Sequence, residues 1–111
     1  MNYNDKIFKP ISNSSNGEVS SDMEFHYHQN GGILTCYYKG PNIKQGHLIG
    51  LVSKDGSIDM RYHQINAKGE ICTGKCLSIP EKLSNGKIRL HEKWQWTSGD
   101  ESFGESILEE V

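Results

Sequence analysis

Apolar and polar residues alternate along most of this chain, and the alternation is clearest near its middle. Between Ser57 and Asn66, apolar Ile58, Met60 and Tyr62 are separated by polar residues. This two-residue period is typical of a β-strand with one buried face. Comparable stretches return at intervals of about ten residues, and none keeps the period of a helix. The pattern therefore predicts about eight strands, at residues 6–11, 23–28, 33–39, 43–53, 57–66, 70–79, 87–97 and 102–111.

Short turns that contain glycine connect many of these stretches. Lys54–Gly56 and Ala67–Gly69 flank the central strand, Asn30–Gly31 is the strongest hairpin signal, and Gly40–Asn42 separates two further strands. Successive hairpins of this kind predict an antiparallel up-and-down meander, and eight strands close into the smallest barrel that can hold a ligand. A turn of helix at 81–83, or at 107–111 in place of a strand, is the alternative. We expect one all-β barrel domain that spans residues 1–111.

The length of each turn predicts which residues lie opposite one another on neighbouring strands. All the expected pairs lie on one face of the sheet, although each turn is considered independently. Glycines are opposite large side chains on that face, as the narrow interior of a small barrel requires, so we assign this face to the inside. The expected pairs are Val52–Ile58, Gly50–Met60, Leu48–Tyr62, Gly46–Gln64, Gln64–Cys72, Tyr62–Gly74, Met60–Cys76, Tyr27–Leu34, Tyr38–Lys44, Cys36–Gly46 and Leu34–Leu48.

The strand at 87–97 places a carboxylate among aromatic residues on the inner face. Burial would raise the pKa of Glu92 unless Lys44 or a hydroxyl group pairs with it. Aromatic walls with a few polar groups are typical of a ligand pocket. The alternative is that these side chains simply fill the barrel, with Glu92 hydrogen-bonded to tyrosines. The candidate ligand-binding residues are Tyr27, Tyr38, Tyr62, Gln64, Glu92, Trp94 and Trp96.

The opposite face of the strands carries more apolar residues than a solvated barrel wall needs. An exposed apolar patch of this kind usually marks a protein interface, so we expect a homo-oligomer packed through the outer wall. Scattered surface aliphatic residues are the alternative. The outward apolar positions are Ile33, Tyr37, Ile49, Leu51, Ile65, Ile71, Leu77 and Ile79.

Composition limits the choice of partners. The 111 residues are 34% hydrophobic, which suits one sheet closed around one core. A formal net charge of -2 gives no general attraction to nucleic acid or to an anionic membrane. No apolar run is long enough to span a membrane, and the polar first residues lack the apolar segment of a signal peptide. We therefore expect a cytoplasmic location and three free thiols.

Histidines and cysteines give weak metal signals. His26 and His28 share the outer face of one strand, but the sequence fixes no third ligand, and solvated surface histidines are the preferred interpretation. His47 opposite His63 is a similar weak candidate. Cysteines four positions apart on one strand are separated by about 13 Å, too far to bind one ion. The sequence predicts no metal and no cofactor.

Three runs resemble a known family of small bacterial proteins that are similar to avidin-like β-barrels. They are Gly46–Val52, Asp59–Gln64 and His91–Asp100. The resemblance covers most of the chain and implies the barrel fold, but supplies no established catalytic residues and no biotin site. Family members often bear the label N-acetylglutamate synthase. Such acetyltransferases resemble larger α/β domains with a Gln/Arg-x-x-Gly-x-Gly/Ala loop, and the residues after Gln45 depart from that spacing.

Three functions are therefore compatible with the sequence. The leading hypothesis is non-enzymatic binding of a small, partly apolar ligand inside the barrel. The second is an enzyme, as the family label implies, that uses Glu92 as acid or base together with His63 or His91. It requires an imidazole within hydrogen-bond reach of the carboxylate beside a cavity. The third is an oligomeric interaction module whose apolar outer wall is the working surface.

Overall fold

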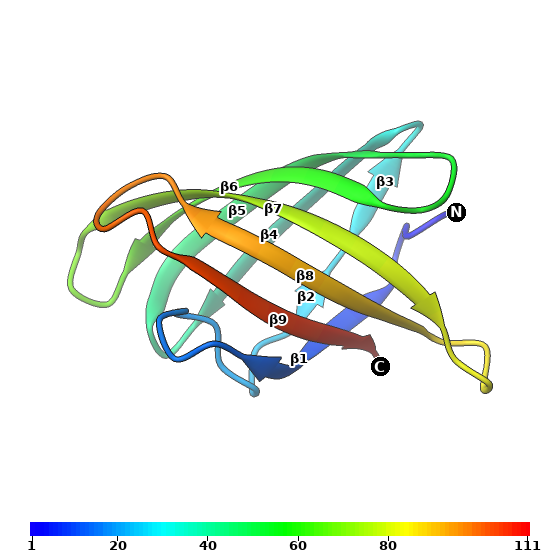
Figure 1. Cartoon of the computed structure of the whole chain (residues 1–111), viewed down its shortest axis with the longest axis horizontal. Coiled ribbons are helices and arrows are strands. Elements are labelled where there is room, and N and C mark those ends of the chain that lie inside the picture. Colours follow the sequence, from blue (N-terminus) through cyan, green and yellow to red (C-terminus); the bar gives the residue numbers. More distant parts are fainter.

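The computed structural model describes all residues 1–111 and contains strands but no helix (Figure 1). The predicted all-β meander is confirmed. The segment around residues 23–28 forms two short strands in place of one, so that nine strands are present. The strands are β1 Ile7–Asn13, β2 Phe25–His26, β3 His28–Asn30, β4 Ile33–Gly40, β5 Ile43–Val52, β6 Ile58–Asn66, β7 Ile71–Lys82, β8 Ile88–Trp96 and β9 Phe103–Glu110.

One antiparallel sheet contains all nine strands, and Tyr27 lies where its two edges meet. The order is β2-β1-β9-β8-β7-β6-β5-β4-β3. Residues 25–30 run along both edges of the sheet: β2, before Tyr27, pairs with β1, and β3, after Tyr27, pairs with β4. The Tyr27 amide donates to the carbonyl of Lys6 at 2.9 Å, and the Tyr27 carbonyl accepts from the amide of Asp5 at 2.9 Å. The sheet is therefore a nearly closed barrel. We call the place where its two edge strands, β2 and β3, meet at Tyr27 the seam.

The predicted register is correct around two turns. The turns at 54–56 and 67–69 give the expected pairs Gly50–Met60, Leu48–Tyr62 and Tyr62–Gly74, with Gly56 and Gly69 at φ of 87° and 82°. Because positive φ is easily adopted only by glycine, these residues fix the length of each turn.

The register around the other two turns was predicted wrongly by two residues. Leu34 pairs with Gln29 and not with Tyr27, since the turn is made by residues 31–32. Tyr38 pairs with Gly46 and not with Lys44, because Gly40 lies opposite Ile43 and an irregularity follows at 43–45. The corresponding pairs are Cys36–Leu48 and Leu34–Gly50, in place of Cys36–Gly46 and Leu34–Leu48. A shift of two residues keeps every side chain on its predicted face except near the irregularity, where Ile43 is buried and Lys44 is exposed.

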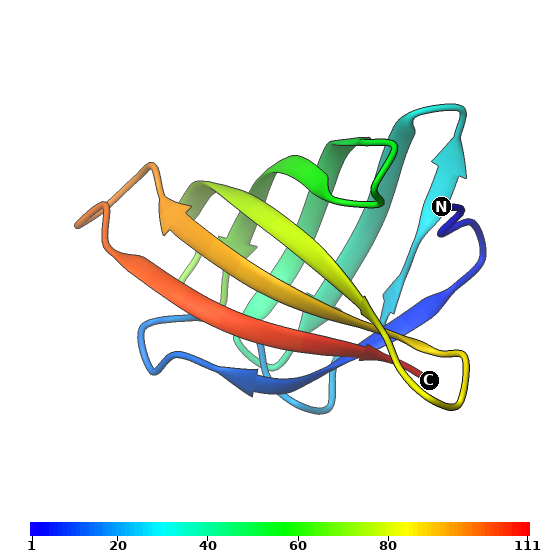
Figure 2. The same cartoon turned by 45° about the vertical axis from the view of Figure 1, so that its right-hand side comes forward.

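The two ends of the barrel are closed by different parts of the chain. At the end near the N-terminus, Tyr3 is completely buried and packs with Phe8 and Tyr27, the ring centroids being 4.9 to 6.2 Å apart. The Tyr3 hydroxyl donates to the carbonyl of Gly56 in the opposite turn. At the other end, the loop that follows β1 turns back along it (Figure 2), and its residues Asn16 and Glu18 bond to Trp96 and Gln64. One end of the interior is therefore packed with aromatic side chains, and the other is covered by a loop.

The remaining expectations concern the outer wall, the cysteines and the possible helices. All eight apolar residues that were assigned to the outer wall are exposed. All three cysteines are free thiols; Cys36 and Cys76 are buried, whereas Cys72 is partly exposed. The last segment is strand and not helix, and residues 81–82 continue β7. None of the secondary structure is a helix that could cross a membrane.

Candidate functional site

A cavity of about 70 Å³ lies inside the barrel beneath the segment 14–24. It is lined mainly by apolar side chains from the inner face of the sheet, and the loop contributes Gly17, Glu18 and Val19. All seven sequence-predicted site residues line it, so the structure brings them together. That they bind a ligand stays a prediction. These seven are Tyr27, Tyr38, Tyr62, Gln64, Glu92, Trp94 and Trp96.

Three of the aromatic walls rest on glycines of the neighbouring strand. Tyr62 is paired with Gly74, and a Cβ atom added to that glycine would overlap the tyrosine ring. The same relation holds for Tyr38 over Gly46 and for Trp94 over Gly104. Without a side chain opposite, each ring lies down against the backbone and leaves space at the centre of the barrel. The glycines thus create the room that the cavity occupies.

Glu92 is held at the cavity wall by two serine hydroxyls. Ser78 Oγ donates to Oε2 at 3.0 Å, and Ser106 Oγ donates to Oε1 at 3.3 Å. Both serines are the cross-strand partners of Glu92, on β7 and β9. Burial raises the pKa of Glu92 to about 7, although the two hydrogen bonds lower it in part. The Glu92 side chain borders the cavity and is surrounded by protein. Because its pKa is about 7, it is present near neutral pH both as carboxylic acid and as carboxylate.

The predicted partner of Glu92 was Lys44 or a hydroxyl group, and the structure selects the hydroxyls. Lys44 is exposed on the outside, because the irregularity in β5 turns it away from the interior. Ser78 and Ser106 were missed by the sequence analysis. Both serines alternate with inward apolar residues, which indicates that they face the interior. The long turns before and after β8 left open which residues of β7 and β9 lie opposite Glu92.

A chain of polar side chains connects the cavity to its cover. Tyr38 Oη donates to Gln64 Oε1 at 2.9 Å, and Gln64 Nε2 donates to Glu18 Oε1 at 2.7 Å. Asn66 Nδ2 donates to the other oxygen, Glu18 Oε2, at 3.0 Å. Glu18 therefore fixes the loop to the mouth of the barrel through two amide groups. The sequence analysis missed Glu18, since nothing in the local pattern places a loop over the opening.

Further contacts hold the segment 14–24 in place. Trp96 Nε1 donates to the carbonyl of Asn16 at 3.1 Å, and Asn13 Nδ2 donates to the carbonyl of Val19 at 3.0 Å. Val19 itself packs against the core. Asn16 Nδ2 donates to the Ser102 hydroxyl and to the carbonyl of Phe103, both at 2.9 Å, and Met23 is buried in the core. The cover is thus fastened at both of its ends, and Glu18 and Val19 are the part that faces the cavity.

One hydroxyl group in the site has no partner. The Tyr27 side chain is completely buried and lines the cavity, yet its hydroxyl makes no hydrogen bond. Burial raises the pKa of this phenol well above its usual value, with the charge of Glu92 contributing, so the hydroxyl keeps its proton. A buried polar group without a partner costs about 1 to 3 kcal/mol, which a bound molecule could recover.

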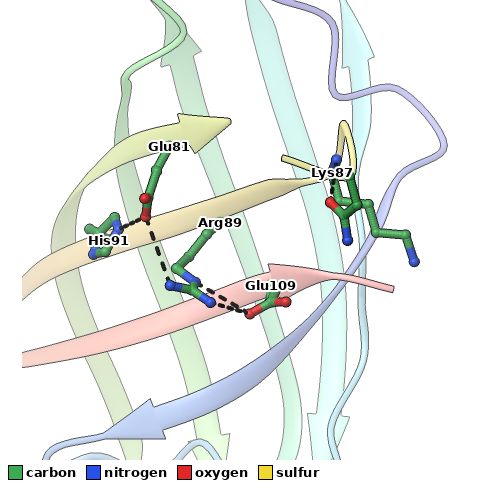
Figure 3. A network of polar contacts seen from close by, with 6 residues as sticks. Glu81, Lys87, Arg89, His91 and Glu109 are labelled. Carbon is green, nitrogen blue, oxygen red and sulfur yellow. Dashed lines mark hydrogen bonds and ion pairs between the residues drawn. The ribbon is translucent and has the colours of Figure 1, made fainter. Parts of the chain in front are cut away.

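The histidines proposed to act with Glu92 lie on the other side of the wall. His63 and His91 are both exposed on the outer face. His91 Nε2 is 2.8 Å from Glu81 Oε1, in a surface network where Arg89 also contacts Glu109 at 3.1 Å (Figure 3). The hydrogen bond from His91 is the main cause that lowers the pKa of Glu81. The pairing of Glu92 with an imidazole that the enzyme hypothesis requires is therefore not formed.

Comparison with known proteins supports the fold from an independent direction. The family model described as avidin-like protein matches residues 1–111, which is the whole chain. A search of curated proteins and a search of solved structures each found no match. The barrel topology agrees with the family match. The chain therefore belongs to the avidin-like protein family.

Proposed function

We propose that this protein is a non-enzymatic binder of a small, partly apolar molecule in the cavity beneath the segment 14–24. The observation that supports this most is Tyr27, which lines a cavity walled by Trp94, Trp96 and Tyr62 and whose hydroxyl is a buried donor without a partner. A barrel interior evolved only for stability would fill the space and pair the hydroxyl. Membership of the avidin-like family is in keeping with a role in small-ligand binding.

The lining limits the chemistry of the ligand. The rings of Tyr62, Trp94 and Trp96 meet edge to face, with Tyr62–Trp96 and Trp94–Trp96 centroids 5.6 and 5.7 Å apart, and offer an apolar surface. Tyr27 and protonated Glu92 are hydrogen-bond donors at the same cavity. A molecule with an apolar body and a hydrogen-bond acceptor, such as a carbonyl oxygen, matches this arrangement.

The size of the cavity implies that the loop takes part in binding. A volume of about 70 Å³ is roughly half that of an engineered 150 Å³ protein cavity that binds benzene. With the cover in place, only a few non-hydrogen atoms fit. A larger ligand must displace Val19 and Glu18 from the mouth, which breaks the two hydrogen bonds that Glu18 accepts from Gln64 and Asn66.

The direct test is to look for the ligand and then remove its proposed partner. Native mass spectrometry of untagged protein from its own cells should show an adduct of small mass. Tyr27→Phe should weaken the adduct while it raises the free energy of unfolding of the ligand-free protein by about 1 kcal/mol, since the unpaired hydroxyl is gone. Tyr37→Phe is the matched control because Tyr37 is an exposed tyrosine, and it should change neither quantity.

Two results would contradict the proposal. One is the absence both of any adduct and of any change in tryptophan fluorescence with a panel of small amides and ketones. The other is an adduct that Tyr27→Phe and Tyr37→Phe affect equally. Denaturant unfolding of both variants shows whether a loss of adduct comes from loss of the fold.

We also propose that two copies associate through the outer wall of β4 to β7. The register places Ile33, Leu51, Asp59 and Leu77 side by side across these four strands, and Leu51 is 63% exposed. Asp59 is the charged member of this otherwise apolar row, and its Oδ1 lies 2.6 Å from Arg61 Nη1. A second copy related by a two-fold axis near this pair can place each arginine beside the partner's aspartate, which makes the surface self-complementary.

Leu51→Lys is expected to convert a dimer into monomers, because it puts a charge at the centre of the apolar contact. Light scattering coupled to size exclusion measures the molar mass. Phe103→Lys is the control, since Phe103 is also exposed, at 74%, but lies on β9, outside the row. A wild-type protein that stays monomeric at high concentration would exclude this interface.

A further inference from the structure

Two histidines and one aspartate converge on the outside of the barrel, at the seam. His26 and His28 flank Tyr27, whose side chain points into the core, so both imidazoles point outward. Asp5 reaches the same place from the N-terminal segment, because its amide is bonded to the Tyr27 carbonyl between them. The sequence analysis found the histidine pair but no third ligand. The fold supplies one.

The geometry of the three side chains suits a metal ion. Asp5 Oδ1 lies 3.5 Å from His26 Nε2 and 3.9 Å from His28 Nδ1, and all three donor atoms lie within 4.8 Å of one another. Ligands at zinc-type distances in tetrahedral geometry are about 3.3 Å apart. The observed spacing is slightly wider, and exposed side chains can close that difference by small rotations.

The surroundings of Asp5 orient its carboxylate. Asn4 Nδ2 donates to Asp5 Oδ2 at 3.4 Å, which leaves Oδ1 directed at the imidazoles. The Asn4 side chain is tied in turn to the amide of Gln29 on β3, at 2.9 Å. Asp5 adopts a φ of 62°, a left-handed conformation that is uncommon outside glycine and brings the carboxylate to the seam. Such outer hydrogen bonds normally support metal ligands.

The two histidine rings lie close enough to share one ion. They are stacked with centroids 4.7 Å apart and planes 29° from parallel. Together with the Asp5 carboxylate, their ring nitrogens form a compact set of three donor atoms. We propose that Asp5, His26 and His28 bind a divalent transition metal ion of the zinc class. Two nitrogens and one oxygen favour Zn²⁺, Ni²⁺ or Cu²⁺ over Mg²⁺ and Ca²⁺, and leave a coordination position for solvent.

The test uses the whole, untagged chain and Zn²⁺ as the probe, because a histidine tag would bind the metal itself. Calorimetric titration should give one equivalent of Zn²⁺ bound. Asp5→Asn, His26→Gln and His28→Gln should each weaken binding at least about tenfold, since even the outer partners of metal ligands are commonly worth that much. Zn²⁺ should also raise the midpoint of thermal unfolding of the wild type, because it ties the N-terminal segment to the seam.

His47→Gln is the matched control. His47, which is partly buried, and exposed His63 form another histidine pair on the outer face, with ring centroids 5.3 Å apart, but no carboxylate completes it. The variant should keep full Zn²⁺ binding. The proposal is overturned if the wild type shows no saturable binding, or if His47→Gln lowers the affinity while Asp5→Asn leaves it unchanged. Circular dichroism of each variant confirms that the barrel is folded, so that a loss of binding reports on the ligands.

Discussion

Glu92→Gln is expected to stabilise the protein at a pH of about 8, by as much as about 3 kcal/mol, and to flatten the pH dependence of its stability. Ionisation of the Glu92 carboxyl group inside the barrel costs free energy, whereas the glutamine amide does not ionise. Glutamine also keeps both hydrogen bonds, because the hydroxyls of Ser78 and Ser106 can each donate or accept. Replacing a polar residue of the site should therefore raise the free energy of unfolding.

The sign of the pH dependence follows from whether the folded or the unfolded state binds the Glu92 proton more tightly. Burial raises the pKa of Glu92 from 4.5 in the unfolded chain to about 7 in the folded protein. Between these two values the folded state binds more protons, so the contribution of this group to stability is full below pH 4.5 and is lost as the pH rises through about 7. One pKa unit corresponds to about 1.4 kcal/mol, which gives about 3 kcal/mol as an upper limit, reduced by any water in the cavity.

Urea unfolding at a series of pH values measures this effect. Glu105→Gln removes an exposed carboxylate from the neighbouring strand β9 and should leave the wild-type profile unchanged. If Glu92→Gln loses stability with rising pH as steeply as the wild type, the carboxyl group is solvated and the account of the site is wrong. A variant that is more stable but binds the ligand less well would show that Glu92 is kept for binding, at a cost in stability.

The sequence predicted the inner face of the sheet because that face depends on a period of two. Even where the turn at residues 31–32 and the irregularity at 43–45 shifted the register, the shift of two residues returned Tyr38 and Leu34 to the same side. All seven candidate side chains therefore reached one cavity. Lys44 is the exception, because the irregularity changed its parity and moved it to the outside.

Features that depend on contacts between distant segments could not be predicted in this way. Glu18 reaches Gln64 across 46 positions of sequence, and nothing in the loop's composition indicates that it covers the barrel. Asp5 reaches the two histidines only because the seam pairs the N-terminal segment with Tyr27. Both depend on how the barrel closes, which is decided by the whole sheet and not by any single hairpin.

Gly74→Ala is expected to destabilise the protein by about 1 to 3 kcal/mol and to abolish ligand binding. The new methyl group would overlap the ring of Tyr62, which lies over this glycine. The ring can move only toward the cavity, so the substitution fills the space that the ligand needs. The sign is informative, since glycine to alanine inside a strand otherwise stabilises by about 0.5 to 1 kcal/mol through a smaller loss of chain entropy. Denaturant unfolding and native mass spectrometry measure the two effects.

A double-mutant cycle separates the steric clash from any other effect of the methyl group. Gly32→Ala is the control at an exposed glycine, because the nearest atom to its added Cβ is the Val52 carbonyl oxygen at 3.9 Å. This substitution should leave the free energy of unfolding unchanged or raise it. When Tyr62 is first replaced by leucine, Gly74→Ala should lose most of its cost, because the ring that it displaces is absent. An equal cost in both backgrounds would mean that the glycine serves the backbone of β7 and not the ring, and that the paired glycines do not create the cavity.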